Sequence, residues 1–159
     1  KKARFKEGWY RGDTVNYSIG QGFLLTTPLQ LATMYAVIAN GGKLVRPRLA
    51  KRLPVQAAEL NLASNQLNVI RKGLDYVVRR GTARRAGGFG ITVAGKTGTA
   101  QNAHGDDHAL FVGCAPMDNP KYVAVAMLEA GLHGGSVASP MVGEMLSYLL
   151  VPESRMKTP

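Results

Sequence analysis

The segment from Gly90 to Gln101 reads GITVAGKTGTAQ, and it contains two short motifs that belong to different chemistries. Gly90, Gly95, Lys96 and Thr97 match the phosphate-loop spacing G-x-x-x-x-G-K-[ST]. Lys-Thr-Gly at 96–98 is instead a motif of enzymes that transfer acyl groups through a serine. The segment could therefore bind a nucleotide phosphate or take part in acyl transfer.

The residues around the motif argue against a phosphate loop. Such a loop needs a strand before its first glycine and a helix that begins at the lysine and threonine. Here the residues before Gly90 are the loop-like RRAGGF, while ITVA inside the motif is β-branched and strand-like. The residues after Thr97, GTAQNAHGDDH, are poor helix formers. We therefore place Lys96 to Thr99 on a strand.

On a strand at the edge of a cleft, these residues have the groups that acyl transfer needs. Lys96 would place a positive charge beside a nucleophile or a substrate carboxylate. Gly98 has no side chain, so a substrate backbone could lie against the strand. Thr99 offers its hydroxyl to a carboxylate and its backbone N–H to a developing oxyanion.

Two other groups of residues could carry chemistry. His104, Asp106, Asp107 and His108 form the cluster HGDDH, but Gly105 and the polar context favour an exposed loop over a metal site. We predict neither a metal nor another cofactor. Cys114 is the single cysteine and lies in an apolar strand, so we expect a buried thiol that forms no internal disulfide.

Helices are predicted on either side of the basic segment 43–52. The first begins after Thr27, a good N-cap, with Pro28 at its first position and Gln30 completing a capping box. It ends at the glycine pair that follows Asn40, and Pro47 then excludes a central strand.

The second helix is predicted over about 65–80, with Ser64 as its cap and Gly81 as its stop. Arg79 and Arg80 suit its C-terminal end. Its apolar stripe consists of Leu67, Ile70, Leu74, Val77 and Val78.

Three strands and a last helix follow. The strands are ITVAGKTGT, HALFVGCAP and YVAVAML, and PMDNPK joins the second to the third as a hairpin. The last helix has Ser139 as its cap, Pro140 at its first position and Pro152 at its end. Its predicted buried face consists of Met141, Val142, Met145, Leu146, Leu149 and Leu150. The order of elements favours an α+β fold, in which helices pack on an antiparallel sheet.

Composition bounds the possible functions. The 159 residues suit one domain, and no apolar run is long enough to span a membrane. The chain has neither an initiator Met nor a signal peptide, so we expect a fragment. The net charge of +10 raises nucleic acid as a partner, and RRGTARR at 79–85 is one of its basic clusters. Without a nucleic-acid motif we favour solvated basic faces and predict no nucleic acid, and a basic nucleic-acid-binding module stays as the alternative from another class.

Four stretches resemble class B penicillin-binding proteins over nearly the whole chain, and the first is most like the elongation-type enzymes. They are GDTVNYSIGQGFLLTTPLQLATMYAVIANGGKLVRP, AGKTGTAQ, HALFVGCAP and HGGSVASP. The resemblance implies a membrane-anchored D,D-transpeptidase that cross-links peptidoglycan on the periplasmic side of the bacterial inner membrane and is acylated by β-lactams. It also implies a five-stranded antiparallel sheet covered by helices, of which the predicted strands would be the third to the fifth.

The resemblance assigns roles to single residues. Lys96 would be the motif lysine and Thr99 a catalytic residue whose N–H stabilises the oxyanion. Thr97, Gly98, Thr99 and Gln101 would bind the substrate. HGGS at 133–136 would be a structural loop between the last strand and the last helix.

The family's nucleophile lies in a Ser-x-x-Lys motif that is followed by Ser-x-Asn, and neither occurs before Lys96. SRMK at 154–157 lies on the wrong side of Lys96, and Ser64 is directly followed by Asn65. We therefore expect residues 1–159 to be the C-terminal portion of one transpeptidase domain, with flexible ends at 1–12 and 152–159. Without the serine, this chain alone could not form an acyl-enzyme.

The expected partners are the stem peptide, β-lactams, the missing N-terminal part and the cell-wall elongation machinery. A β-lactamase or D,D-carboxypeptidase with the same motif stays as an alternative. A further alternative is a fragment with only a structural role, which folds when it meets the missing N-terminal part.

Overall fold

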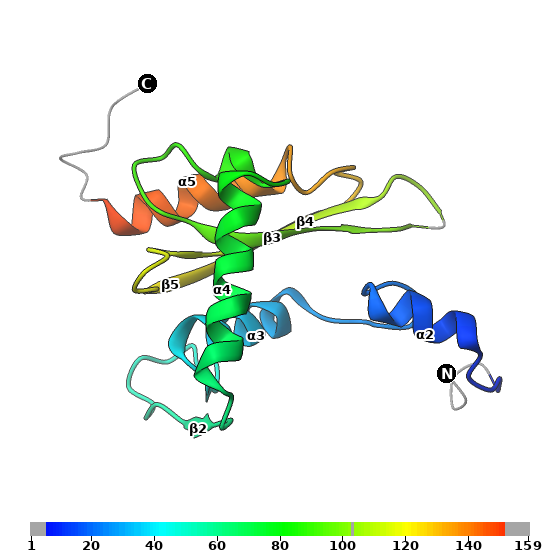
Figure 1. The fold of residues 1–159 in the computed structure, drawn as a ribbon, viewed down its shortest axis with the longest axis horizontal. Helices are drawn as coiled ribbons and strands as arrows, with labels where there is room; N and C mark the ends of the chain where they lie inside the picture. The colour runs from blue at the N-terminus through cyan, green and yellow to red at the C-terminus, as the bar shows by residue number, and fades with distance from the viewer. Residues whose placement is uncertain (1–5, 103, 152–159) are drawn as a thin grey trace.

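The computed structural model describes residues 6–102 and 104–151, and Figure 1 shows its helices and strands. Their order is α2 (Arg11–Ser18), α3 (Pro28–Asn40), β1 (Lys43–Val45), β2 (Ala57–Glu59), α4 (Ser64–Arg79), a 3-10 turn (Arg84–Ala86), β3 (Ala94–Ala100), β4 (His108–Ala115), β5 (Tyr122–Leu128) and α5 (Ala138–Leu150).

The main sheet is an antiparallel meander in the order β3-β4-β5, as predicted. Lys96 lies opposite Val112, and Val112 lies opposite Val125. The 116–121 turn joins β4 to β5 as the expected hairpin. β1 and β2 form a separate antiparallel pair, and β1 ends before Pro47. β2 was not predicted, because its three residues, AAE, have no apolar alternation.

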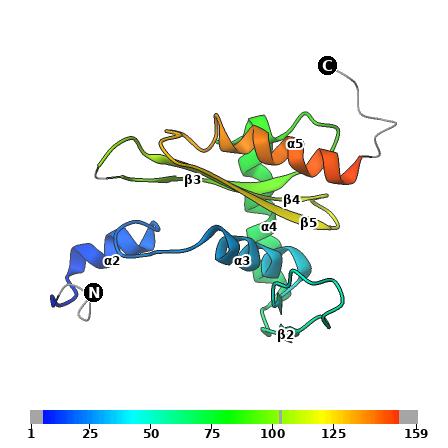
Figure 2. The ribbon, with the colours of Figure 1, turned by 180° about the vertical axis from the view of Figure 1, so that it is seen from behind.

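The sheet lies between two helical layers, and the apolar residues of successive positions point to opposite faces. Phe111 of β4 packs with Val142 and Leu146 of α5 on one face. Cys114 packs with Ala39 of α3 and Leu74 of α4 on the other face. Figures 1 and 2 show α5 and α3 on opposite sides of the sheet, with α4 running across it from one layer to the other.

The predicted capping box of α3 is confirmed. The Thr27 hydroxyl accepts a hydrogen bond from the Gln30 N–H at 3.2 Å, and the Gln30 side chain accepts one from the Thr27 N–H at 2.8 Å. Gly41 ends the helix with φ of 90°, in the left-handed conformation that suits glycine. Arg71 of α4 donates to the carbonyls of Ile38 and Ala39 at 2.9 and 2.6 Å, so a cation joins α4 to the C-terminal end of α3.

The predictions that Ser64 and Ser139 are helix N-caps were wrong. Ala63 is the N-cap of α4, it makes no side-chain cap hydrogen bond, and Ser64 is the first helical residue. Val137 precedes α5, and Ser139 is buried in its first turn, where its hydroxyl donates to the Gly135 carbonyl at 2.8 Å. In both places the helix begins one or two residues earlier than predicted, because packing rather than the cap decides where the turn starts.

The predicted helical stripes were partly wrong. In α5, Val142 and Leu146 are fully buried, but Met141, Met145 and Leu149 are about half exposed. The long apolar side chains therefore extend beyond the narrow strip that contacts the sheet. In α4, Leu67, Leu74 and Val78 are buried, whereas Ile70 is exposed.

α2 lies beyond the main body, below the far end of the β3–β4 hairpin in Figure 1, and none of its residues is buried. It was not predicted, and it begins inside the segment 1–12 that was expected to be a flexible end. Residues 1–5 and 152–159 of the two expected ends, with Pro152 and SRMK, lie outside the described residues. Across the described ranges, no helix combines the length and the apolar character that crossing a membrane requires.

Candidate functional site

The Lys-Thr-Gly motif lies on β3, which is an edge strand of the main sheet. Thr97 and Thr99 lie opposite Phe111 and Ala109, two residues of the core beneath α5, so both threonines are on the α5 face. Lys96 and Gly98 alternate with them and therefore lie on the opposite face. Because Lys96 is in the middle of a strand, no helix N-terminus is available there to bind a phosphate.

The edge of β3 that faces away from β4 presents main-chain groups. The Gln21 side chain donates to the Thr99 carbonyl at 3.0 Å, and the Lys96 ammonium donates to the Thr97 carbonyl at 2.8 Å. In an extended strand the N–H and C=O of one residue point to the same edge. The Thr99 N–H therefore also points away from β4, which is the direction that an oxyanion donor needs.

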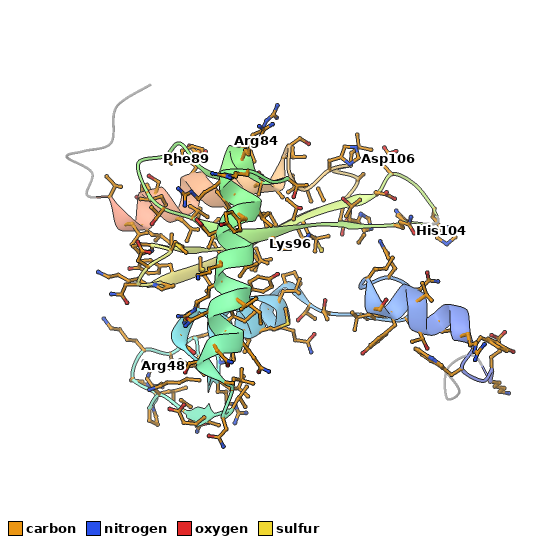
Figure 3. The ribbon with its side chains drawn as sticks, in the orientation of Figure 1. Arg48, Arg84, Phe89, Lys96, His104 and Asp106 are labelled. Atoms are coloured by element: carbon orange, nitrogen blue, oxygen red, sulfur yellow. The ribbon has the colours of Figure 1, made fainter. Side chains whose placement is uncertain are left out.

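An open cleft with a volume of about 480 Å³ adjoins Thr97 and Thr99. Its walls are the turn at 81–85 after α4, the α5 face of β3 and the loop at 133–136 before α5. We call it the β3 cleft. In Figure 3 Lys96 lies on β3 beside α4, and Arg84 lies at the end of α4 next to the segment that leads into α5.

Three close contacts hold the walls of the β3 cleft together. The hydroxyls of Thr82 and Thr97 are 2.7 Å apart and share a hydrogen bond. Gly134 lies against the β3–β4 pair, because a Cβ atom there would overlap with the carbonyl oxygens of Gly98 and Leu110. A Cβ atom at Gly135 would likewise overlap with the Thr82 carbonyl oxygen. As expected, the 133–136 loop lies between the last strand, β5, and the last helix, α5.

The structure brings together most of the predicted site residues. Lys96, Thr97, Gly98 and Thr99 lie on consecutive positions of the free edge, with Thr97 and Gly98 half-buried and Lys96 and Thr99 exposed. Gln101 lies just beyond the end of β3 and is exposed.

Three contributors to this site were not predicted from the sequence. Gln21 reaches β3 across 78 positions of sequence from a turn flanked by Gly20 and Gly22, which have φ of 80° and 73°. Those glycines in IGQG signal a sharp turn, but its partner strand is not evident from the sequence. Thr82 and the neighbouring arginines of RRGTARR were interpreted as solvent-facing, because nothing in the sequence places that turn beside β3.

The two remaining candidate groups make structural contacts. The His108 ring nitrogen Nδ1 accepts a hydrogen bond from the Ala130 N–H at 3.1 Å, and Asp107 accepts one from the Asn102 N–H at 3.3 Å. Within 6–102 and 104–151, no three His, Cys, Asp or Glu side chains are placed to hold a metal ion. Cys114 is buried as predicted. Burial raises the pKa of its thiol, and the nearby positive charge of Arg71 lowers it to a smaller extent.

Comparisons with known proteins agree with this geometry. Residues 2–147 match the penicillin-binding protein transpeptidase domain. The peptidoglycan D,D-transpeptidase MrdA of Haemophilus influenzae is 34% identical, over 94% of this chain and 28% of the relative. The chain thus spans less than a third of that relative's length.

Two solved structures are similar over nearly the whole chain. One is Pseudomonas aeruginosa PBP2 in complex with WCK 5153, at 38% identity and a TM-score of 0.84, over 96% of this chain and 37% of that one. The other is the complex between PBP2 and MreC from Helicobacter pylori, at 32% identity and a TM-score of 0.81, over 95% of this chain and 30% of that one. With the family match, the fold and the Lys-Thr-Gly strand, these likenesses lead to one conclusion: the chain belongs to the penicillin-binding protein transpeptidase domain family.

Proposed function

We propose that this chain is the C-terminal portion of a peptidoglycan D,D-transpeptidase of the PBP2 type, which cross-links stem peptides through a serine acyl-enzyme and is acylated by β-lactams. The observation that carries the proposal is the free edge of β3, where the Lys96 side chain and the Thr97 and Thr99 main-chain groups meet. The 28% coverage of the Haemophilus transpeptidase supports the view that the nucleophile lies on another segment.

In this proposal the four motif residues of β3, 96–99, each have a role. An extended stem peptide lies along the free edge, as in strand addition, and Gly98 leaves room for its backbone. Lys96 turns its ammonium from the Thr97 carbonyl to the nucleophile or the substrate carboxylate. The Thr99 N–H donates to the oxyanion that develops on the attacked carbonyl, and the Thr97 and Thr99 hydroxyls bind the carboxylate. Gln101 contacts the substrate beyond the end of the strand.

The same proposal covers location and partners. The intact protein is anchored in the bacterial inner membrane, and this domain works on the periplasmic side with the cell-wall elongation machinery. The support is the likeness to PBP2 that is seen in complex with MreC in Helicobacter pylori.

A fluorescent penicillin tests the function. The full-length protein that contains this chain should form a covalent band that unlabelled penicillin competes away, whereas the isolated chain should form none, because it lacks the activated serine. A competable band on the isolated chain would place the nucleophile within residues 1–159, and no band on the full-length protein would refute the proposal.

Product analysis separates the transpeptidase from its near alternatives. The full-length protein is given a stem-peptide donor together with an amine acceptor. A transpeptidase yields the cross-linked product, whereas a carboxypeptidase yields the shortened peptide alone. Rapid hydrolysis of the bound penicillin would instead indicate a β-lactamase.

A further inference from the structure

The basic turn at 81–85 forms one wall of the β3 cleft, and its sequence explains which side chains face the opening. Ala83 and Ala86 are both fully buried. Residues three apart lie on the same side of a 3-10 turn. Burying these two alanines therefore directs Arg84 and Arg85 outward, and both arginines are exposed and line the cleft.

The cleft is rich in hydrogen-bond donors and positive charge. The Thr97 and Thr99 side chains line it together with the two arginines, and no Asp or Glu is among its lining residues. The ion pairs between described residues are Lys43 with Glu59 and Arg79 with Asp75, so neither Arg84 nor Arg85 has a carboxylate partner there. Arg85 donates to the Ser136 carbonyl at 3.2 Å, which holds its guanidinium across the cleft.

This arrangement suits a carboxylate. Two neighbouring guanidinium groups repel each other, and a bound anion removes that repulsion. Guanidinium donors form short, charge-assisted and often bidentate hydrogen bonds with carboxylates, and hydroxyl groups can donate further hydrogen bonds to the carboxylate oxygens. A substrate on the free edge of β3 would reach both the threonines and the arginines, since they line one cleft.

We propose that Arg84 and Arg85 form the cationic wall of a carboxylate-binding subsite, which binds the terminal carboxylate of the stem peptide or the carboxylate of a β-lactam together with Thr97 and Thr99. The inference rests on the proposed function, and it gives part of the basic segment RRGTARR a role in substrate selection.

Acylation of the full-length protein by benzylpenicillin and by its methyl ester, which lacks the charge, tests the subsite. In the double variant R84Q/R85Q, the second-order rate constant for benzylpenicillin should fall by about 10- to 100-fold, the scale for hydrogen bonds to a charged group. The rate constant for the ester should stay within about twofold of that of the unchanged protein. R84K/R85K keeps the charge but loses the planar fork, so it should recover part of the loss.

Arg80→Gln is the matched control, because Arg80 is an exposed arginine at the end of α4 that does not line the cleft. It should leave both rate constants unchanged. Raising the salt concentration should lower the rate constant for acylation of the unchanged protein by benzylpenicillin. It should have much less effect on the acylation of R84Q/R85Q.

Several results would overturn the subsite. These are an unchanged benzylpenicillin rate in R84Q/R85Q, an equal loss for penicillin and ester, or an equal loss in R80Q. Failure of the proposed function would look different, since the unchanged protein itself would then not react with either compound.

Discussion

Lys96 is exposed in the middle of an edge strand, and its ammonium bonds the carbonyl of its own neighbour. A lysine in this position contributes little to the core, so its charge is available for chemistry. Thr97 differs, because its hydroxyl forms a hydrogen bond with the Thr82 hydroxyl and so links two walls of the cleft, in addition to the carboxylate binding that we propose for it. A substitution at Lys96 should therefore change activity with less effect on stability than a substitution at Thr97.

Lys96→Ala in the full-length protein should lower the rate of penicillin acylation by roughly a hundredfold, the scale for losing a positioned electrostatic or proton-transfer group. The melting temperature should stay close to that of the unchanged protein. Lys72→Ala removes an exposed lysine of α4 and serves as the control. Normal acylation of the Lys96 variant would remove this residue from the active site.

Substitutions at Gly98 should affect the access of substrate to the strand without affecting the stability of the fold. A Cβ atom there would meet only the Leu110 Cβ, at the ordinary contact distance of 3.4 Å, so the fold should accept a side chain. Gly98→Val should nevertheless reduce acylation by about tenfold or more, because the branched side chain stands where a substrate backbone approaches. Gly98→Ala should reduce it less. If the valine variant folds and reacts normally, this strand does not line the substrate site.

At the scale of elements, the loop at 133–136 sets the distance between α5 and the sheet. It contacts the turn at 81–85 through Gly135 and the β3–β4 pair through Gly134. The Ser139 N–H donates to the Gly134 carbonyl at 2.8 Å, which ties the loop to the first turn of α5. The glycines of HGGS are therefore needed for close packing, and the cleft exists because they lack side chains.

Gly134→Ala should lower the free energy of unfolding by about 1–3 kcal/mol, the usual cost of forcing extra volume into a packed region. Gly73→Ala is the matched control. A Cβ atom at Gly73 meets nothing within 4 Å, and alanine is the better helix former, so this change should raise stability by up to about 1 kcal/mol. Urea denaturation of the three proteins measures both effects. Equal stability of Gly134→Ala and the parent would contradict the close packing of the loop.

In the molecule as a whole, the layer between α3, α4 and the sheet contains two weakly acidic side chains, the buried Cys114 and the partly buried Tyr35, whose ionisation is disfavoured. Burial raises the pKa of Tyr35, with a smaller contribution from Cys114, and burial also raises the pKa of Cys114 itself. A raised pKa means that the folded state holds the proton more tightly than the unfolded state. The stabilisation is complete below the pKa of the unfolded group and is lost as the pH rises through the folded pKa.

The free energy of unfolding should therefore fall as the pH rises above about 8.5, the ordinary pKa of a cysteine. Cys114→Ala should weaken this pH dependence, because it removes one of the two groups. Urea denaturation at neutral and alkaline pH measures the difference. A fall of the same size in both proteins would show that Cys114 does not contribute.

The order and type of the main elements, and the position of the motif on a strand, could be predicted from the amino-acid sequence alone. Turn glycines, prolines, the Thr27 capping box and apolar alternation act over a few residues, so they can be interpreted without the fold. The motif residues Lys96 to Thr99 are also contiguous in the chain, so their resemblance to the family's motif can be recognised without the fold.

The distant residues that surround this segment could not be predicted in this way, because long-range packing brings them together. Gln21, Thr82 and the 133–136 loop meet β3 because the meander makes it an edge strand and because α4 and α5 pack against the sheet. The serine caps and the half-exposed methionines of α5 differ from the prediction for the same reason. Long-range packing selects the helix start and the buried side of each helix, and no local pattern records it.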